Sequence, residues 1–131
     1  RYTLPGTLLG TPLYMSPEQV RAGAIDARAD QYALGCILYE LLVGELPFAA
    51  PTVSKLLFKH LAEAPEPPRK RVPGLAVSAS LESLVLRLLA KDPDARYPSM
   101  HAVEEALAAE LVALQPRPGL RGLGRSTQAL I

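Results

Sequence analysis

The chain has 131 residues, which is enough for one domain with a hydrophobic core. Its 14 Lys and Arg against 13 Asp and Glu leave a formal net charge of +1, so no overall electrostatic field favours nucleic acid or an acidic membrane as a partner. A single cysteine excludes an internal disulfide and any metal site built from several thiolates.

The chain opens on a loop that leads into a short helix. Residues 1–13 hold three threonines, two glycines and two prolines with no helical or strand period. This composition is typical of a loop, and loops of this length usually have a function. The sequence Ser16-Pro17-Glu18-Gln19 then supplies an N-cap, a proline at the first helical position and a glutamine at the third. The pattern predicts a capping box that opens a helix through Arg21.

The central predicted element is a helix over about residues 28–43. Its apolar residues wrap most of the way round, which indicates a helix buried on most sides. It is shorter than the roughly 20 apolar residues that span a bilayer, and it carries Asp30 at one end and Glu40 inside. Gly44 supplies the residue at which such helices commonly stop. We expect the other segments to pack around this helix, with Cys36 as a buried apolar filler.

Further helices are predicted after the central one. Each follows a hydroxyl residue suited to the N-cap, and each carries an apolar stripe along one face. The predicted ranges and caps are about 53–62 with Thr52 or Ser54, 80–90 with Ser80, and 99–114 with Ser99.

Two segments look irregular. Residues 65–77 hold four prolines and a glycine, which predicts an extended connector with no core of its own. Residues 115–131 hold two prolines, three glycines and three arginines, which predicts a disordered tail or linker. The sequence shows no convincing strand and no internal repeat, so the expected fold class is mainly α.

The sequence offers few groups for chemistry. It has no phosphate-binding glycine loop, no cluster of metal ligands and no histidine placed to activate a serine or threonine. His60 and His101 have no partner at metal-ligand spacing, so His60 is interpreted as a half-buried helix residue and His101 likewise as a non-ligand. The polar residues that stand out, as candidates for buried pairs or caps, are Thr11, Glu18, Asp30 and Arg96.

Three stretches resemble the protein kinase family. Residues 10–18, GTPLYMSPE, are similar to the end of the activation segment, with Ser-Pro-Glu in place of the usual Ala-Pro-Glu. Residues 30–42, DQYALGCILYELL, resemble the central helix of the C-terminal lobe, and residues 91–97, KDPDARY, resemble the arginine motif before its last helix. The sequence of residues 10–19 is similar to that of the serine/threonine class, and in particular to that of bacterial kinases of the eukaryotic type.

The resemblance implies a domain organisation. Residues 1–114 would be a partial C-terminal (large) lobe of the protein kinase fold without the N-lobe, and residues 1–18 of this part would be the activation segment. The predicted helices at about 28–43, 53–62, 80–90 and 99–114 would build the body of the lobe. The segment 115–131 would follow it as a tail.

The resemblance also implies roles for single residues. A substrate wall, which would bind the substrate residue after the phosphoacceptor, would consist of Gly10, Thr11, Pro12, Leu13 and Tyr14. Thr11 would also hydrogen-bond the catalytic aspartate. Thr7, and after it Thr3, would be phosphorylation sites, whose added charge of about −1.5 to −2 would pair with arginines. Glu18 and Arg96 would form a buried ion pair, and Asp30 would accept hydrogen bonds from the backbone of the catalytic loop.

The remaining kinase motifs are expected before residue 1. These are the glycine-rich loop, the β3 lysine, His-Arg-Asp with its asparagine, and Asp-Phe-Gly. Phosphoryl transfer depends on the groups that they supply, so we expect the chain alone to bind neither ATP nor Mg²⁺ and to be inactive. The parent kinase would use ATP and Mg²⁺ to phosphorylate Ser and Thr of protein substrates, and its N-terminal part would be a partner of this chain. The alternative is a non-catalytic protein-interaction module derived from a kinase lobe.

Two expectations concern the whole chain. No signal peptide or membrane segment is recognisable, so a cytoplasmic location without membrane or nucleic-acid contact is expected for this segment, while the parent could be anchored beyond the tail. The central helix is apolar nearly all round, and the remaining helices cover only part of it. We therefore expect an exposed apolar patch and an isolated chain that is not a stable soluble monomer.

Overall fold

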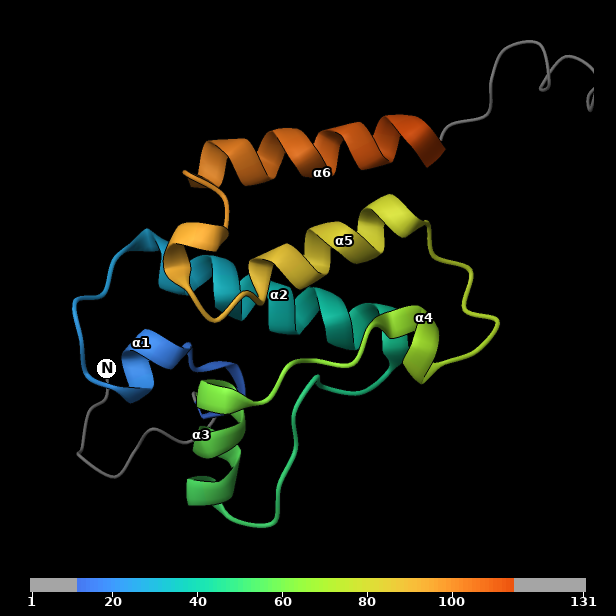
Figure 1. Ribbon diagram of the computed structural model, residues 1–131. Helices are drawn as coiled ribbons and strands as arrows, with labels where there is room; N and C mark the ends of the chain where they lie inside the picture. Colours follow the sequence, from blue (N-terminus) through green and yellow to red (C-terminus); the bar gives the residue numbers. More distant parts are fainter. Residues whose placement is uncertain (1–11, 115–131) are drawn as a thin grey trace, which may run out of the picture.

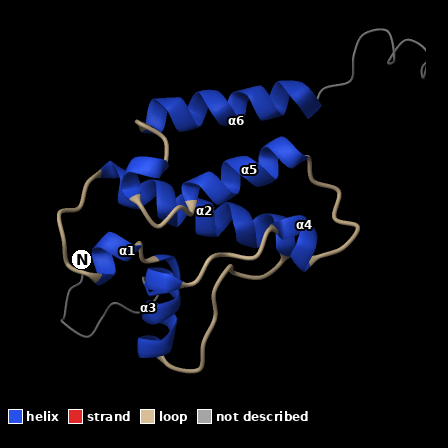
Figure 2. Cartoon of the chain, viewed as in Figure 1, coloured by secondary structure: helices blue, strands red, loops and turns tan. Residues whose placement is uncertain are grey.

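The structure is a computed structural model that describes residues 12–114, so positions 3, 7, 10 and 11 and the predicted tail at 115–131 lie outside the described residues. Between residues 12 and 114 the chain forms helices joined by loops, without a strand (Figures 1 and 2). The predicted mainly α fold class is confirmed. The elements in order are η1 (Pro12–Tyr14), α1 (Pro17–Val20), α2 (Ala27–Val43), α3 (Val53–Ala62), α4 (Pro68–Arg71), α5 (Ala79–Leu88), η2 (Pro93–Ala95) and α6 (Met100–Leu114).

Helix α2 is the centre of the described part of the chain. Figure 1 shows α5 lying along α2, with α6 beyond α5, while α1 and α3 lie on the opposite side of α2. The helix begins at Asp26, whose carboxylate accepts a hydrogen bond from the backbone N–H of Arg28 at 2.9 Å. It ends at Gly44, where φ is 92°, a left-handed conformation that glycine adopts at little cost.

One side of α2 forms the core. Tyr32, Cys36 and Tyr39 pack with Val85 and Leu89 from the region of α5. Cys36 is fully buried, and burial raises the pKa of its thiol to about 12, so it remains a neutral thiol among apolar neighbours, in the manner of a small hydrophobic residue.

Close packing of α2 on α5 depends on Gly35. A Cβ atom at this position would lie 2.9 Å from Cβ of Leu88 and 3.0 Å from Cγ of Leu89. Both atoms are near their own backbones, so neither can move far without moving the chain. The absent side chain therefore sets how closely the two helices approach.

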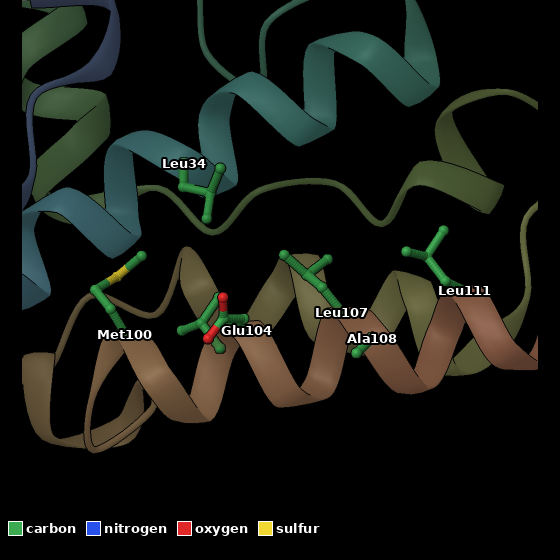
Figure 3. Close-up of a pocket in the computed structure, with 7 residues that line it drawn as sticks. Leu34, Met100, Glu104, Leu107, Ala108 and Leu111 are labelled. Carbon is green, nitrogen blue, oxygen red and sulfur yellow. The ribbon is translucent and has the colours of Figure 1, made fainter.

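Another side of α2 exposes apolar side chains in the described part of the chain, as the sequence predicts. Ile37 is 43 % exposed and Leu41 is 75 % exposed. Next to this side, an open groove of about 300 Å³ separates α2 from α6, and Figure 3 shows Leu34 of α2 facing Leu107 and other side chains of α6 across it. Val103 is the one residue of α6 that is buried. The groove is lined by Leu34, Met100, Val103, Glu104, Leu107, Ala108 and Leu111.

The predicted helix starts are largely confirmed. The Ser16 hydroxyl accepts from the Gln19 N–H at 3.3 Å while the Gln19 side-chain oxygen accepts from the Ser16 N–H at 2.8 Å, which is the predicted capping box. Thr52, and not Ser54, caps α3. The Ser99 hydroxyl accepts from the Ala102 N–H at 3.0 Å at the start of α6.

Two local predictions are wrong. Ser78, and not Ser80, caps the helix predicted at 80–90, and this helix already ends at Leu88. The Ser78 backbone is extended and its hydroxyl accepts from the Leu81 N–H at 3.0 Å, whereas Ser80 lies inside the first turn and donates to Glu110 at 3.1 Å.

The connector at 65–77 is likewise not fully extended, because it contains the helical turn α4. Pro68 stands at the first position of this turn, where its fixed φ favours a helix. The carboxylate of Glu82 accepts the Arg69 N–H at 2.7 Å. This acceptor comes from α5 and so stabilises a turn that the local sequence alone does not predict.

Candidate functional site

A buried ion pair joins α1 to the loop before α6. The guanidinium of Arg96 donates to the two carboxylate oxygens of Glu18 at 2.7 and 2.9 Å. Arg96 is 2 % exposed and Glu18 is 8 % exposed. The prediction that these residues form a buried salt bridge is confirmed. Burial by itself would raise the pKa of Glu18, but the hydrogen bonds and charge of Arg96 hold this pKa below its usual value.

Arg96 also binds the main chain of two other segments. It donates to the carbonyl oxygens of Arg28 and Ala90, both at 2.8 Å. One guanidinium therefore fixes α1, the first turn of α2 and the end of the α5 region relative to one another. Nearby, Arg28 also contacts the carboxylates of Asp26 and Asp94, which adds a second, more exposed link between α2 and η2.

The described part of the predicted substrate wall lies against α3. Pro12 is buried and Leu13 and Tyr14 are half-buried in η1, which contacts both α2 and α3. Between η1 and the start of α3 lies a groove of about 260 Å³. Its lining is mainly apolar, with Thr52 as a polar member, and consists of Pro12, Leu13, Ala50, Pro51, Thr52, Val53 and Leu56.

Behind the groove lies a polar cluster that the sequence interpretation missed. His60 of α3 is fully buried rather than half-buried, and its Nδ1 lies 2.8 Å from the Tyr32 hydroxyl. The Nζ of Lys91 lies 3.5 Å from the same hydroxyl and 3.2 Å from the Lys59 carbonyl oxygen. The one available sequence signal is that His60 follows Leu56 by one helical turn on the apolar face of α3.

The side chain of Asp30 is on the surface and is not part of these contacts. It belongs to the first turn of α2 and is exposed. Of the predicted site residues within the described part, the structure thus brings Glu18 and Arg96 together, aligns Pro12 and Leu13 along a groove, and leaves Asp30 open to solvent.

The described residues are poor in metal ligands. Among residues 12–114, no group of three or more His, Cys, Asp or Glu side chains is placed to hold a metal ion. In the same range, no helix has both the length and the apolar character needed to cross a membrane. The two grooves are lined mainly by apolar side chains, with Glu104 in the groove between α2 and α6 and Thr52 in the groove between η1 and α3.

Known proteins similar to this chain are bacterial kinases. Serine/threonine-protein kinase pkn3 of Myxococcus xanthus is 46% identical over 112 residues, which are 86% of this chain and 20% of the relative. Serine/threonine-protein kinase PknB of Mycobacterium tuberculosis is 46% identical over 95 residues, which are 72% of this chain and 15% of the relative. Pkn1 of Myxococcus xanthus is 45% identical over 123 residues, 89% of this chain and 18% of the relative.

The chain therefore spans a fifth or less of the length of these curated relatives. The family described as the protein kinase domain matches residues 3–108, which is most of the sequence. The helical fold, the buried Glu18–Arg96 pair and these identities all point to the same family. The chain belongs to the protein kinase family and is related to the serine/threonine-protein kinases of bacteria.

Proposed function

We propose that this chain is the substrate-facing part of the C-terminal lobe of a serine/threonine protein kinase. The observation that carries the proposal is the buried Glu18–Arg96 pair. Glu18 follows the predicted substrate wall by four residues, so the pair supports a rigid attachment of the wall to the helical body. A substrate wall needs such an attachment because transfer requires the acceptor hydroxyl to be held in position.

In this proposal the activation segment is residues 1–18. The wall at residues 10–14 receives the substrate residue that follows the phosphoacceptor, and the apolar groove beside Pro12 and Leu13 favours an apolar side chain there. Thr11 supports the catalytic aspartate of the preceding part of the kinase. The exposed carboxylate of Asp30 is accessible to backbone donors of the catalytic loop.

Regulation in this proposal occurs through phosphorylation. Thr7 is the first expected site and Thr3 the second, because both precede the wall in the sequence. Thr11 stays unmodified because its hydroxyl has a structural partner. Phosphopeptide mapping of the active full-length protein should find phosphate on Thr7, and phosphate on Thr11 alone, or on none of the three, would contradict this assignment.

The nucleotide site belongs to another part of the parent kinase. Transfer of the γ-phosphate of ATP to a Ser or Thr hydroxyl requires Mg²⁺ ligands, a lysine and an aspartate base. Among residues 12–114, no group of three or more His, Cys, Asp or Glu side chains is placed to hold a metal ion, and the proposal puts the Mg-ATP ligands in the preceding part of the kinase. The chain alone is therefore expected to be inactive.

The test is a comparison of two proteins. The full-length protein that contains this chain should transfer phosphate from labelled ATP to Ser or Thr of a peptide library, and the 131-residue chain should neither transfer phosphate nor bind Mg-ATP by calorimetry. The coding sequence upstream of Arg1 should encode His-Arg-Asp and Asp-Phe-Gly. A specific micromolar ATP site on the isolated chain, or an upstream sequence without these motifs, would overturn the proposal.

A non-catalytic interaction module is the second candidate. It is favoured by the exposure of Val53 and Phe58 on α3, which are 56 % and 66 % exposed, and Val53 also lines the groove beside η1. A full-length protein that folds, transfers no phosphate and still binds protein through Phe58 would support this candidate, and loss of binding in Phe58→Ser would locate the surface.

A further inference from the structure

Gln31 is a buried glutamine near the start of α2. It is 0 % exposed, and both ends of its side-chain amide bind one residue of the loop before α6. The amide nitrogen donates to the Tyr97 carbonyl oxygen at 2.9 Å, and the amide oxygen accepts from the Tyr97 N–H at 3.0 Å. Burying an amide costs free energy unless its polar atoms are paired, so this side chain suits its site only while Tyr97 lies opposite it.

The Gln31 amide completes the main-chain hydrogen bonds of residues 95–97. The N–H groups of the first two residues donate to the carbonyl oxygens of Asp92 and Pro93. The carbonyl oxygens of the same two residues accept from Arg87, both at 3.3 Å, and Gln31 binds both groups of the third. Arg87 is exposed and its hydrogen bonds are long, whereas Gln31 is buried and its hydrogen bonds are shorter. Gln31 is therefore the stronger of the two side-chain attachments of this main chain.

The register of this segment determines which side chain reaches Glu18. Arg96 precedes Tyr97, and its guanidinium lies 2.7 and 2.9 Å from the two Glu18 carboxylate oxygens. A shift of the segment by one residue moves each Cα atom by about 3.8 Å, which is more than a parallel pair of hydrogen bonds tolerates. Pro98 comes next in the sequence, and it cannot replace Tyr97 opposite Gln31 because proline has no N–H.

We propose that Gln31 is a positioning residue for substrate binding, which holds the main chain beside Arg96 in the register that lets its guanidinium bind Glu18. The inference rests on the proposed function, because the attachment of Glu18 matters for a substrate only if residues 10–14 are the substrate wall. The effect of Gln31 passes through Tyr97 and Arg96 in turn. Loss of the amide should therefore loosen α1 and the wall while the nucleotide site of the parent kinase stays intact.

One substitution and one matched control separate this role from core packing. Gln31→Met keeps a side chain of similar length but removes both hydrogen bonds to Tyr97, because a thioether is at most a weak acceptor. Val85→Ala is the control. Val85 is 0 % exposed and packs on Tyr32 and Cys36 of α2, so its truncation leaves a cavity in the core but no unpaired main-chain group.

The first experiment needs no activity. Hydrogen–deuterium exchange of the full-length protein should show a protected Tyr97 amide, and Gln31→Met should speed exchange at Tyr97 and at the α1 amides of Gln19 and Val20 by about two- to tenfold, the equivalent of one lost hydrogen bond. Val85→Ala should leave the α1 amides unchanged. Unchanged α1 exchange in a folded Gln31→Met protein would overturn the proposal. An unprotected Tyr97 amide in the wild type would do so even if the variant failed to fold.

The second experiment measures steady-state kinetics of the full-length protein with a peptide substrate. Gln31→Met should raise the KM for peptide by about two- to tenfold and leave the KM for ATP unchanged, whereas Val85→Ala should change neither constant. Glu18→Gln should also raise the peptide KM, and adding Gln31→Met to it should add little, because both changes weaken the same attachment. Fully multiplicative effects of the two substitutions would contradict the role of Gln31.

The two experiments also separate this inference from the proposed function. A full-length protein without kinase activity would contradict the proposed function, and the exchange rates of the α1 amides would still decide whether Gln31 holds Glu18 in place. An active kinase whose peptide KM is the same in the wild type and in a folded Gln31→Met protein would leave the proposed function standing and overturn the positioning role.

Discussion

At the residue scale, Arg96 is the most highly connected side chain of the site. Its guanidinium donates to the Glu18 carboxylate and to the Arg28 carbonyl oxygen, 78 and 68 positions away in sequence, and to the nearby Ala90 carbonyl oxygen. Taking the guanidinium away leaves a carboxylate that is 8 % exposed without its cation. An uncompensated buried charge is strongly destabilising, more so than the ion pair is stabilising.

We expect Arg96→Ala to lower the free energy of unfolding of the kinase domain by about 3–5 kcal/mol. Arg96→Lys should rescue little, because one ammonium cannot donate to both oxygens of Glu18 in parallel. Urea denaturation measures both values. Adding Glu18→Gln to Arg96→Ala should recover part of the loss, and strictly additive losses would contradict the pairing.

A second residue-scale prediction concerns pH and His60. The pKa of His60 is lowered from 6.5 to about 4, mainly because the ring is buried and in smaller part because of the charge of Lys91. Between these values the unfolded chain binds a proton that the folded chain does not, so the free energy of unfolding should rise as pH increases from about 4 to 6.5.

Urea denaturation midpoints of the kinase domain, measured across this pH range, test whether the free energy of unfolding rises with pH. His60→Gln does not titrate, so the curve of this variant should be flatter than that of the wild type. His101→Gln provides a comparison in which an exposed histidine is removed instead of the buried one. Identical slopes for wild type and His60→Gln would show that the buried ring does not contribute.

At the element scale, the contact between α2 and α5 depends on a missing side chain. Gly35→Ala adds a Cβ atom 2.9 Å from Cβ of Leu88, which forces the helices apart. The expected loss is about 1–3 kcal/mol from overpacking, reduced by the roughly 1 kcal/mol by which Ala favours a helix over Gly. Gly23→Ala is the matched control, because its nearest atom would be 3.8 Å away. Thermal unfolding of the kinase domain compares the two variants, and a Gly35→Ala protein more stable than the wild type would contradict the close approach.

The helices were largely predictable because their signals are local. The capping box at Ser16 and the stop at Gly44 depend on residues within a few positions of one another. The turn α4 was not predictable in this way, because the acceptor for its Arg69 N–H is Glu82, which lies on α5. Local propensity cannot reveal a partner that only the tertiary fold supplies.

The contacts of the site residues were likewise not predictable from the local sequence. Glu18 and Arg96 are 78 positions apart, so their pairing was predicted through the family resemblance and not from spacing. His60 was interpreted as half-buried, because the pattern of α3 shows which residues share a face but not what covers that face. The structure places Tyr32 and Phe48 around it, from segments that precede α3.

At the scale of the whole molecule, large apolar side chains are exposed on neighbouring helices. Ile37 and Leu41 on α2 and Leu111 on α6 are 43 %, 75 % and 63 % exposed. Each large apolar side chain left in water forgoes about 1.5–3 kcal/mol, and a domain has only about 5–15 kcal/mol of net stability. A few such side chains therefore decide whether the chain is stable by itself.

We expect the isolated 131-residue chain to self-associate or to unfold partly, and to bind a hydrophobic dye. Light scattering and dye fluorescence measure these properties. Leu41→Lys combined with Leu111→Lys should lower association, whereas a Lys substitution at the exposed position Glu105, which does not line the groove, should not. A monodisperse chain that binds no dye and melts cooperatively would show that the bare side of α2 is tolerated.

The separation of Glu18 and Arg96 along the sequence also has a consequence for synthesis of the protein. A ribosome that adds about 5–20 residues per second needs about 4–16 s to make the 78 positions between the two residues. Throughout that time the nascent chain has a wall sequence but no guanidinium to anchor it, and the Glu18 carboxylate stays hydrated. The segment that carries Glu18 can be fastened only after Arg96 has left the ribosome, so a partly translated chain lacks the attachment on which the proposed substrate wall depends.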